Sequence, residues 1–280
     1  MKRRRRKPKG QPPPVKVWPH WGPGILAFLE RKASLLAFVL LAVASLRIVA
    51  TYPVFNHTID EPAHIACGLE WLDQGVYRYE HQHPPLARIA VALGPYLDGS
   101  RHTGKPSIYT EGGQILYGRI AYDRTLMLAR LGILPFFWLG AAVTFLWARN
   151  VLGRPAAVLA LLLFTTLPPV LAHAGLATTD MALTSCLLAA CFAMVRWLER
   201  PTLLRSVLLG AAAGAATLSE FSALAFLPAF ATAALAAYVV MERPRTPAMF
   251  GRATCWASCW LLISSERVYR TRTRISKRDG

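Results

Sequence analysis

Long apolar stretches separated by short charged ones make up most of the chain. The first, residues 33–50, is interrupted only by Arg47, and three more follow at 126–147, 155–177 and 179–198. Because about 20 apolar residues cross a bilayer as one helix, each stretch predicts a transmembrane helix. We expect Arg47 to extend its side chain to the membrane interface.

A fifth apolar stretch, residues 207–240, is too long for a single span, and the polar pair Ser219-Glu220 interrupts it. We expect two helices that meet near this pair. The pattern therefore predicts an all-α integral membrane protein with about six transmembrane helices. A last apolar run, residues 253–265, is too short to cross as an ordinary helix.

The distribution of basic residues predicts the orientation of these spans. Residues 1–32 hold ten Lys or Arg and one acid, and segments 148–154, 196–206 and 241–252 are also basic. Because loops rich in Lys and Arg stay in the cytoplasm, all four segments should lie there. We predict a multi-pass protein of the plasma (inner) membrane with a cytoplasmic N-terminus and a polar outer loop, residues 51–124.

Composition agrees with a membrane protein. Apolar residues make up 54% of the chain and charged ones only 17%, whereas a soluble protein has about a quarter charged. The net charge of +17 could suggest nucleic acid, but the basic residues gather beside apolar spans, where they meet anionic lipid. We expect membrane lipid and no nucleic acid as a partner. A cleaved signal peptide is the alternative for the first span, since Ala42-Val43-Ala44 resembles a cleavage site.

Within the outer loop, two segments have the spacing of amphipathic helices. Apolar residues at helical spacing are Ile65, Leu69, Leu72 and Val76 in the first segment. The second begins at His83-Pro84-Pro85, where proline suits a first turn, and continues with Leu86, Ile89, Ala90 and Leu93. We expect short helices that lie along the membrane surface.

Several polar residues of this outer side are candidates for chemistry. Asp60 and Glu61 could cap the helix that Pro62 begins, or one could act as a general base. Asp180, in Thr178-Thr179-Asp180, could likewise cap a span, but an acid at membrane depth is a functional candidate by default. Topology also places Glu220 near the outer face. The convergence of Asp60, Asp180 and Glu220 on one side favours a functional site. The loop histidines are spaced too loosely to predict a metal site from them alone: His57, His64, His81 and His83.

These residues carry a resemblance to a known family. The run from Asp60 to Leu93 resembles the first outer loop of bacterial GT-C glycosyltransferases, which include protein O-mannosyltransferase-like and lipid A aminoarabinose transferase-like enzymes. The paired acids, His83–Leu86, Thr178–Asp180 and Leu218–Pro228 follow in the family's order, the last with one departure. The resemblance covers roughly residues 33–240.

The resemblance implies a mechanism at the outer face. A sugar carried on polyprenyl phosphate is transferred to a hydroxyl of a lipid, glycan or protein acceptor, and the lipid phosphate leaves. Asp60 would be the general base, with Glu61 and Asp180 beside it as catalytic residues. Substrate-binding roles would fall to His64, His83, Arg88 and Glu220. Some relatives bind a divalent metal and others do not, so the cofactor stays open.

Two departures from the family pattern matter. Glu220 stands where the family usually has a lysine that would hold the carrier phosphate, so Arg88 or Arg119 would have to compensate. The chain also ends in a basic tail, residues 267–280, where relatives continue through more spans. We expect three parts: a cytoplasmic tail (1–32), a GT-C-like transmembrane domain (33–240) and a C-terminal tail (241–280) of a truncated or frame-shifted product.

Two other functions remain open from the sequence. A non-catalytic membrane protein could keep the fold and bind a lipid-linked sugar, as Glu220 would favour. A transporter could use Asp180 and Glu220 as ion sites, although we find no internal repeat.

Overall fold

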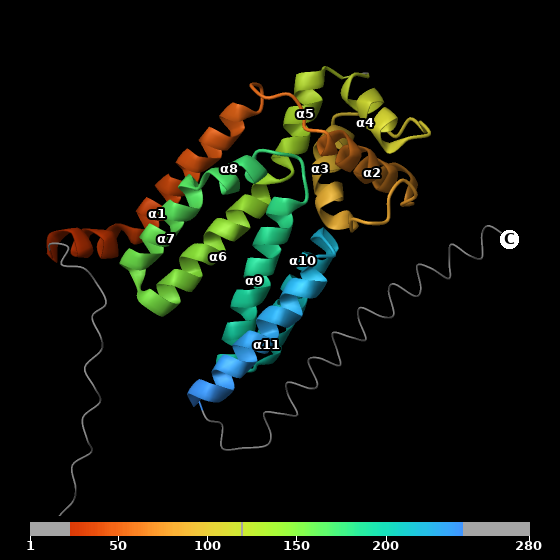
Figure 1. Cartoon of the computed structure of the whole chain (residues 1–280). Helices are drawn as coiled ribbons and strands as arrows, with labels where there is room; N and C mark the ends of the chain where they lie inside the picture. The colour runs from red at the N-terminus through yellow and green to blue at the C-terminus, as the bar shows by residue number, and fades with distance from the viewer. Residues whose placement is uncertain (1–22, 119, 243–280) are drawn as a thin grey trace, which may run out of the picture.

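The chain is described by a computed structural model over residues 23–118 and 120–242. In this part every regular element is a helix and there is no strand, as predicted. Figure 1 shows long helices gathered at one end and shorter ones at the other. The helices are α1 (Pro23–Thr51), α2 (Asp60–Gln74), α3 (Pro85–Leu97), α4 (Ile108–Leu116), α5 (Tyr122–Leu131), α6 (Leu134–Leu152), α7 (Arg154–Thr166), α8 (Pro168–Ala174), α9 (Asp180–Glu199), α10 (Leu203–Ser219) and α11 (Ala223–Glu242).

By length and composition, three helical segments of the described residues could cross a membrane: Gly24–Thr51, Tyr122–Leu152 and Asp180–Glu199. The bent pair α7 and α8 would make a fourth. The helices α10 and α11 meet beside Glu220 as predicted, but they rank as shorter apolar helices, so their crossing of the membrane stays a prediction. The apolar run 253–265 and both predicted tails, apart from residues 23–32 and 241–242, lie outside the described residues.

The predicted third span, residues 155–177, is broken rather than continuous. It ends as α7 at Thr166 and resumes as α8, with an angle of 63° between them. Pro168 and Pro169 explain the break, because proline has no N–H for the helical hydrogen bond and crowds the preceding turn. The bend turns α8 away from the line of α7, beside the C-terminal end of α1 (Figure 1).

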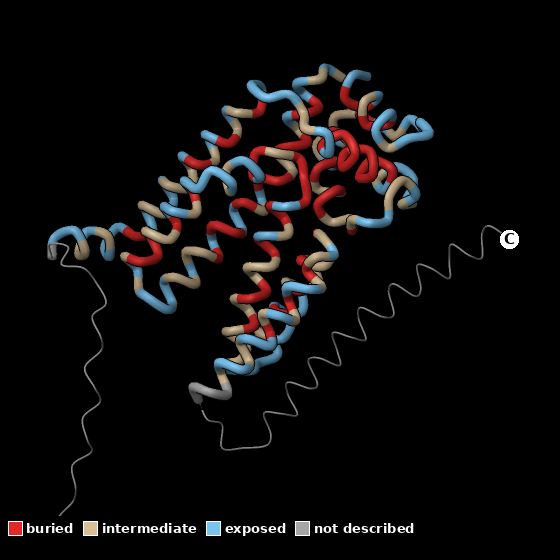
Figure 2. Tube along the Cα trace, viewed as in Figure 1, coloured by how far each residue is buried: buried red, intermediate tan, exposed pale blue. Residues whose placement is uncertain are grey.

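The outer-loop helices form a packed unit around α2. This helix packs against α3 and α4, and α3 packs in turn against α5. Ile65 and Leu69 of α2 are fully buried, but burial is not confined to the predicted apolar face. Every residue from Glu61 to Glu70 is buried, and α2 ends at Gln74, before the predicted Val76. Figure 2 shows the concentration of buried residues here. On α3 the buried face is Ala87, Arg88, Val91, Ala92 and Pro95 rather than the predicted apolar set, and Leu93 is left exposed.

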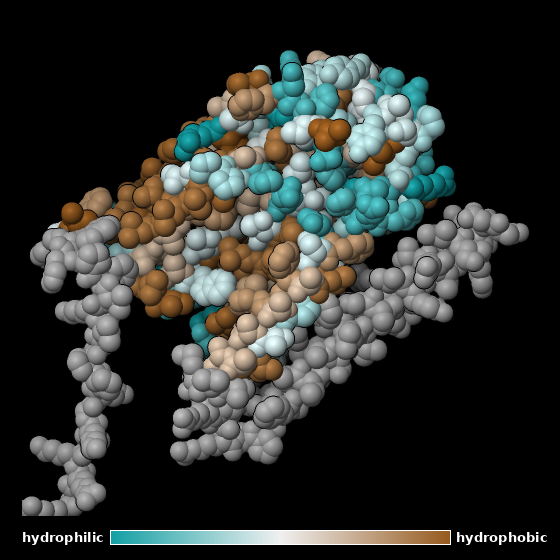
Figure 3. All heavy atoms as spheres, in the orientation of Figure 1, coloured by the Kyte–Doolittle hydropathy of each residue, from teal (hydrophilic) through white to brown (hydrophobic). Residues whose placement is uncertain are grey.

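The second half is built around α9, which packs against α6, α10 and α11. Small residues fill much of this contact, which lets the helix backbones approach closely. Apolar side chains cover the outer surface of the long helices, whereas polar ones gather over the outer-loop helices (Figure 3). The core residues between α9, α10 and α11 include Cys186, Ala190, Ala213, Ala216 and Leu227.

Close packing of α4 on the first turn of α2 leads to a test. A Cβ on Gly112 would collide with the backbone of Pro62, whereas a Cβ on its neighbour Gly113 would meet nothing. We expect Gly112→Ala to lower the free energy of unfolding by about 1–3 kcal/mol through overpacking. Gly113→Ala should be neutral or slightly stabilising, because alanine is the better helix former. Thermal unfolding in detergent would compare the two, and equal midpoints would contradict the close contact.

Candidate functional site

A cavity of about 450 Å³ lies where the outer-loop helices meet the start of α9 and the junction of α10 with α11. Asp60, Asp180 and Glu220 all line it, so the structure brings together three acids that are far apart in sequence. Of the other predicted site residues, the cavity wall includes His64, His83 and Arg88. The remaining lining residues are Ala63, Glu80, Gln82, Ile108, Tyr109, Thr178 and Thr179.

Asp60 is the first residue of α2 and is exposed. The N-cap position belongs to Ile59, and no side chain caps this helix end. No hydrogen bond or ion pair joins the Asp60 carboxylate to a described residue. An unpaired carboxylate on a cavity wall can accept a proton from a bound substrate.

Asp180 begins α9, lines the same cavity and is about half exposed. Its Oδ2 accepts a hydrogen bond from the Thr178 hydroxyl at 2.9 Å and lies 3.3 Å from Nδ1 of His173. Neither Asp180 nor Thr179 caps the helix with its side chain, so the capping alternative is not seen here. Thr178 and His173 instead orient the carboxylate.

Glu220 lies between α10 and α11, where its backbone is extended. Its Oε1 accepts a hydrogen bond from the Ser222 hydroxyl at 2.9 Å. Its Oε2 lies 3.4 Å from the Thr179 hydroxyl, which donates to it. This carboxylate is thus tied to the turn that carries Asp180.

Arg88 is almost fully buried, and its guanidinium is held on three sides. Its Nε donates to Nδ1 of His64 at 3.1 Å, and one terminal nitrogen donates to the Tyr77 hydroxyl at 2.7 Å. The other terminal nitrogen makes a close ion pair with Glu80. Glu80 also contacts Nδ1 of His83 at 2.7 Å. The charge of Arg88 is therefore already balanced by a carboxylate.

Burial shapes the ionisation of this cluster. It lowers the pKa of His64 to about 4, and the neighbouring Arg88 charge adds to the effect. His64 is therefore neutral at pH 7, with an unprotonated Nδ1 that accepts from Arg88. Burial alone would raise the pKa of Glu80, but hydrogen bonds from Arg88 and His83 outweigh it and hold that pKa below its usual value.

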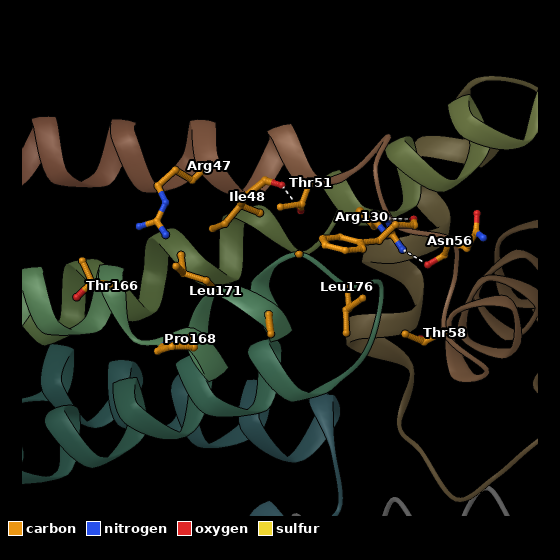
Figure 4. Close-up of a pocket in the computed structure, with 13 residues that line it drawn as sticks. Arg47, Ile48, Thr51, Asn56, Thr58, Arg130, Thr166, Pro168, Leu171 and Leu176 are labelled. Carbon is orange, nitrogen blue, oxygen red and sulfur yellow. Dashed lines mark hydrogen bonds between the residues drawn. The ribbon is translucent and has the colours of Figure 1, made fainter.

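Glu61 does not line the cavity, although the sequence pattern suggested a place beside Asp60. It is fully buried and forms a two-point ion pair with Arg130, with N–O distances of 2.8 and 3.0 Å. It also accepts the backbone N–H groups of Thr58 at 2.7 Å and Ala177 at 2.9 Å. Arg130 donates further to the carbonyls of Tyr52, Phe55 and Asn56, in the chain entering α2. Figure 4 shows its bond to Asn56.

The cavity is dominated by negative charge. Its wall carries four carboxyl groups but one guanidinium, that of Arg88. Arg119, the other cation expected to compensate for Glu220, lies outside the described residues. Within the described ranges, no three His, Cys, Asp or Glu side chains are placed to share a metal ion.

Two residues central to this arrangement were missed by sequence reasoning. Arg130 interrupts the apolar stretch 126–147, and a charge at such depth is itself a signal of function or of a buried partner. Glu80 stands in a polar run beside His81 and His83, where nothing in the pattern distinguishes it. Its role follows only from the folding of α3 back onto α2.

The helical fold, with at least three helices able to span a membrane, defines a multi-pass membrane protein. Comparison with known proteins identifies its class as a membrane glycosyltransferase of the GT-C type. Residues 125–265, half of the chain, match the family model described as dolichyl-phosphate-mannose-protein mannosyltransferase. The chain belongs to this family. No curated protein and no solved structure matches it.

The buried ion pair predicts a large effect on stability. Arg130→Met would leave the Glu61 carboxylate buried without a counter-charge, and we expect a loss of about 3–5 kcal/mol in the free energy of unfolding. The double variant Arg130→Met/Glu61→Gln should recover part of this loss, because no uncompensated charge remains. Arg124→Met, which removes an exposed ion pair with Asp98, should change little. Thermal unfolding in detergent measures all three, and no recovery in the double variant would contradict the explanation.

The low pKa of His64 predicts a pH dependence. Between pH 6.5 and about 4 the unfolded chain binds a proton at this residue that the folded chain does not. The free energy of unfolding should therefore fall as pH drops through this window, by up to about 1.4 kcal/mol per pH unit from this group. His64→Asn keeps an acceptor and should flatten that part of the dependence.

Unfolding midpoints at pH 6.5, 5.5 and 4.5 would test this difference. The control is His81→Asn, which changes an exposed histidine of the same loop. It should retain the full pH dependence of the unaltered chain. A slope in His64→Asn as steep as in the unaltered chain would sink the explanation.

Proposed function

We propose that this chain transfers a sugar from a polyprenyl-phosphate carrier to an acceptor hydroxyl at the outer face of the membrane. The observation that carries the proposal is the convergence of Asp60 and Asp180 on one cavity. These acids come from the first outer loop and from the turn before α9, the two places where the family resemblance puts catalytic acids. The basic segments 1–32, 148–154 and 196–206 support a cytoplasmic N-terminus and an outward-facing cavity.

The chemistry needs a base and a place for the leaving group. The acceptor oxygen would form a bond to the anomeric carbon while the bond from that carbon to the phosphate oxygen breaks. The acceptor proton would pass to the Asp60 carboxylate, and the carrier phosphate would leave with the bonding electron pair. Asp60 suits this role because it is exposed and unpaired among the described residues. Asp180, oriented by Thr178, would position the acceptor by accepting a hydrogen bond from another of its hydroxyls.

Glu220 works against the binding of the carrier phosphate. A carboxylate on the cavity wall repels a phosphate, and the nearby Arg88 is already paired with Glu80. This feature favours a second candidate: a non-catalytic member of the family that keeps the cavity and binds a sugar or partner. The two candidates differ in whether the unaltered chain catalyses sugar transfer.

Sugar transfer from polyprenyl-phosphate sugars, measured in membranes, tests the proposal. We expect Asp60→Asn to lower the rate constant for transfer about 10²- to 10⁴-fold, because the base is lost while the side-chain size is kept. Asp123→Asn is the matched control, since Asp123 is exposed but does not line the cavity. Its rate should equal that of the unaltered chain. Equal rates for Asp60→Asn and the unaltered chain would remove Asp60 from the reaction.

The same assay separates the two candidates through Glu220. Glu220→Lys should lower the KM for the carrier-linked sugar, because a cation replaces an anion near the phosphate. The KM of Glu220→Gln should lie between those of Glu220→Lys and the unaltered chain. If the unaltered chain shows no transfer but Glu220→Lys does, the fold can still support the reaction and only the phosphate site is lost. If no variant transfers sugar, although helix content and elution volume are unchanged, the result would support the second candidate, a non-catalytic member of the family.

A further inference from the structure

A second cavity, of about 600 Å³, lies between α1 and the bent pair α7 and α8. We call it the α1/α8 groove. Figure 4 shows side chains from α1, α7, α8 and the loop after α8 around it. Most of its lining is apolar, and the groove is open on one side. Its central apolar residues are Ile48, Pro168, Leu171, Ala172 and Leu176.

Arg47 is the unpaired charge of this groove. Its side chain extends from α1 toward α7 and α8 (Figure 4). It is exposed and has no hydrogen bond or ion pair with a described residue. It lies four residues before Thr51, the end of α1, and so about 6 Å inside that end along the helix axis. A guanidinium with no partner among the described residues is free to bind an anion.

The other arginine on the wall cannot take that anion. An arginine has five N–H donors, and Arg130 uses all five on Glu61 and on the carbonyls of Tyr52, Phe55 and Asn56. Arg47 keeps its full set of donors. The positive potential available in the groove therefore belongs to Arg47.

The groove is separate from the cavity lined by Asp60, Asp180 and Glu220, which we call the acidic cavity. The two share no lining residue. Between them stands the segment that carries Glu61, whose buried carboxylate ties the start of α2 to the N–H of Ala177. A phosphate bound at Arg47 therefore does not share a chamber with Asp60 and Asp180, as the phosphate of a reacting carrier would have to do.

We propose that the α1/α8 groove is a binding site for one anionic glycerophospholipid of the bilayer. Its phosphate is held by the Arg47 guanidinium, which can offer two parallel N–H donors to phosphate oxygens. One acyl chain runs from there toward the bilayer interior along Leu171 and Pro168. The site is independent of the proposed sugar transfer, and it gives the broken span a function: the bend at Pro168 keeps α8 away from the line of α7 and leaves room for the lipid.

Native mass spectrometry of the full chain, delipidated in detergent, tests the site. Phosphatidylglycerol, phosphatidylcholine or polyprenyl phosphate would be added in turn. We expect one phosphatidylglycerol per chain, bound about tenfold more tightly than phosphatidylcholine. Arg47→Gln should abolish that preference, Arg47→Lys should keep most of it, and Ala172→Trp should block binding by filling the groove.

The matched control is Arg149→Gln, which removes an exposed arginine near the end of α6, outside the groove. It should leave the binding of phosphatidylglycerol unchanged. Equal binding of both phospholipids, or full binding by Arg47→Gln and Ala172→Trp, would overturn the proposal. Displacement of phosphatidylglycerol by an equal concentration of polyprenyl phosphate would overturn the assigned occupant. Helix content by circular dichroism would show that each variant is folded.

Discussion

The buried ion pair between Glu61 and Arg130 is the interaction on which the rest of this structure depends. It joins the first residues of α2 to the membrane-spanning segment that begins with α5, and through the N–H of Ala177 to the turn before α9. Such a pair is stable only when its remaining hydrogen-bonding groups are satisfied, and here carbonyls of residues 52–56 and the N–H of Thr58 complete the set. Because Asp60 is the neighbour of Glu61, and Asp180 follows Ala177 by three residues, the tie also sets the two walls of the acidic cavity.

Charge is divided unevenly on the two sides of this tie. The acidic cavity carries four carboxyl groups against one guanidinium that is already paired. The α1/α8 groove is apolar, with an unpaired arginine at its edge. An exposed carboxylate suits proton transfer, and an unpaired guanidinium suits a phosphate. The fold thus keeps a cavity lined by carboxyl groups apart from an apolar groove with an unpaired arginine.

Family membership and local chemistry point in different directions at one residue. The family match supports sugar transfer, and Asp60 and Asp180 line one cavity, as the proposed reaction requires. Glu220 lines the same cavity with the wrong sign of charge for a phosphate. Its hydrogen bonds to Thr179 and Ser222 show that the carboxylate is accommodated by the fold, so the conflict is one of substrate binding and not of stability.

The sequence alone determined the helical membrane fold, because apolar length and the placement of charge follow directly from the bilayer as solvent. It also indicated that Asp60, Asp180 and Glu220 lie on one side, because topology sorts residues by face. Tertiary structure decided what a one-dimensional pattern cannot contain. Glu61 points into the core and pairs with Arg130, whereas its neighbour Asp60 lines the cavity. Arg88 forms an ion pair with Glu80, and two prolines break a predicted span into the bent pair α7 and α8. Neighbouring acids look alike in sequence, and only the packing of α2 against distant segments gives each its partner.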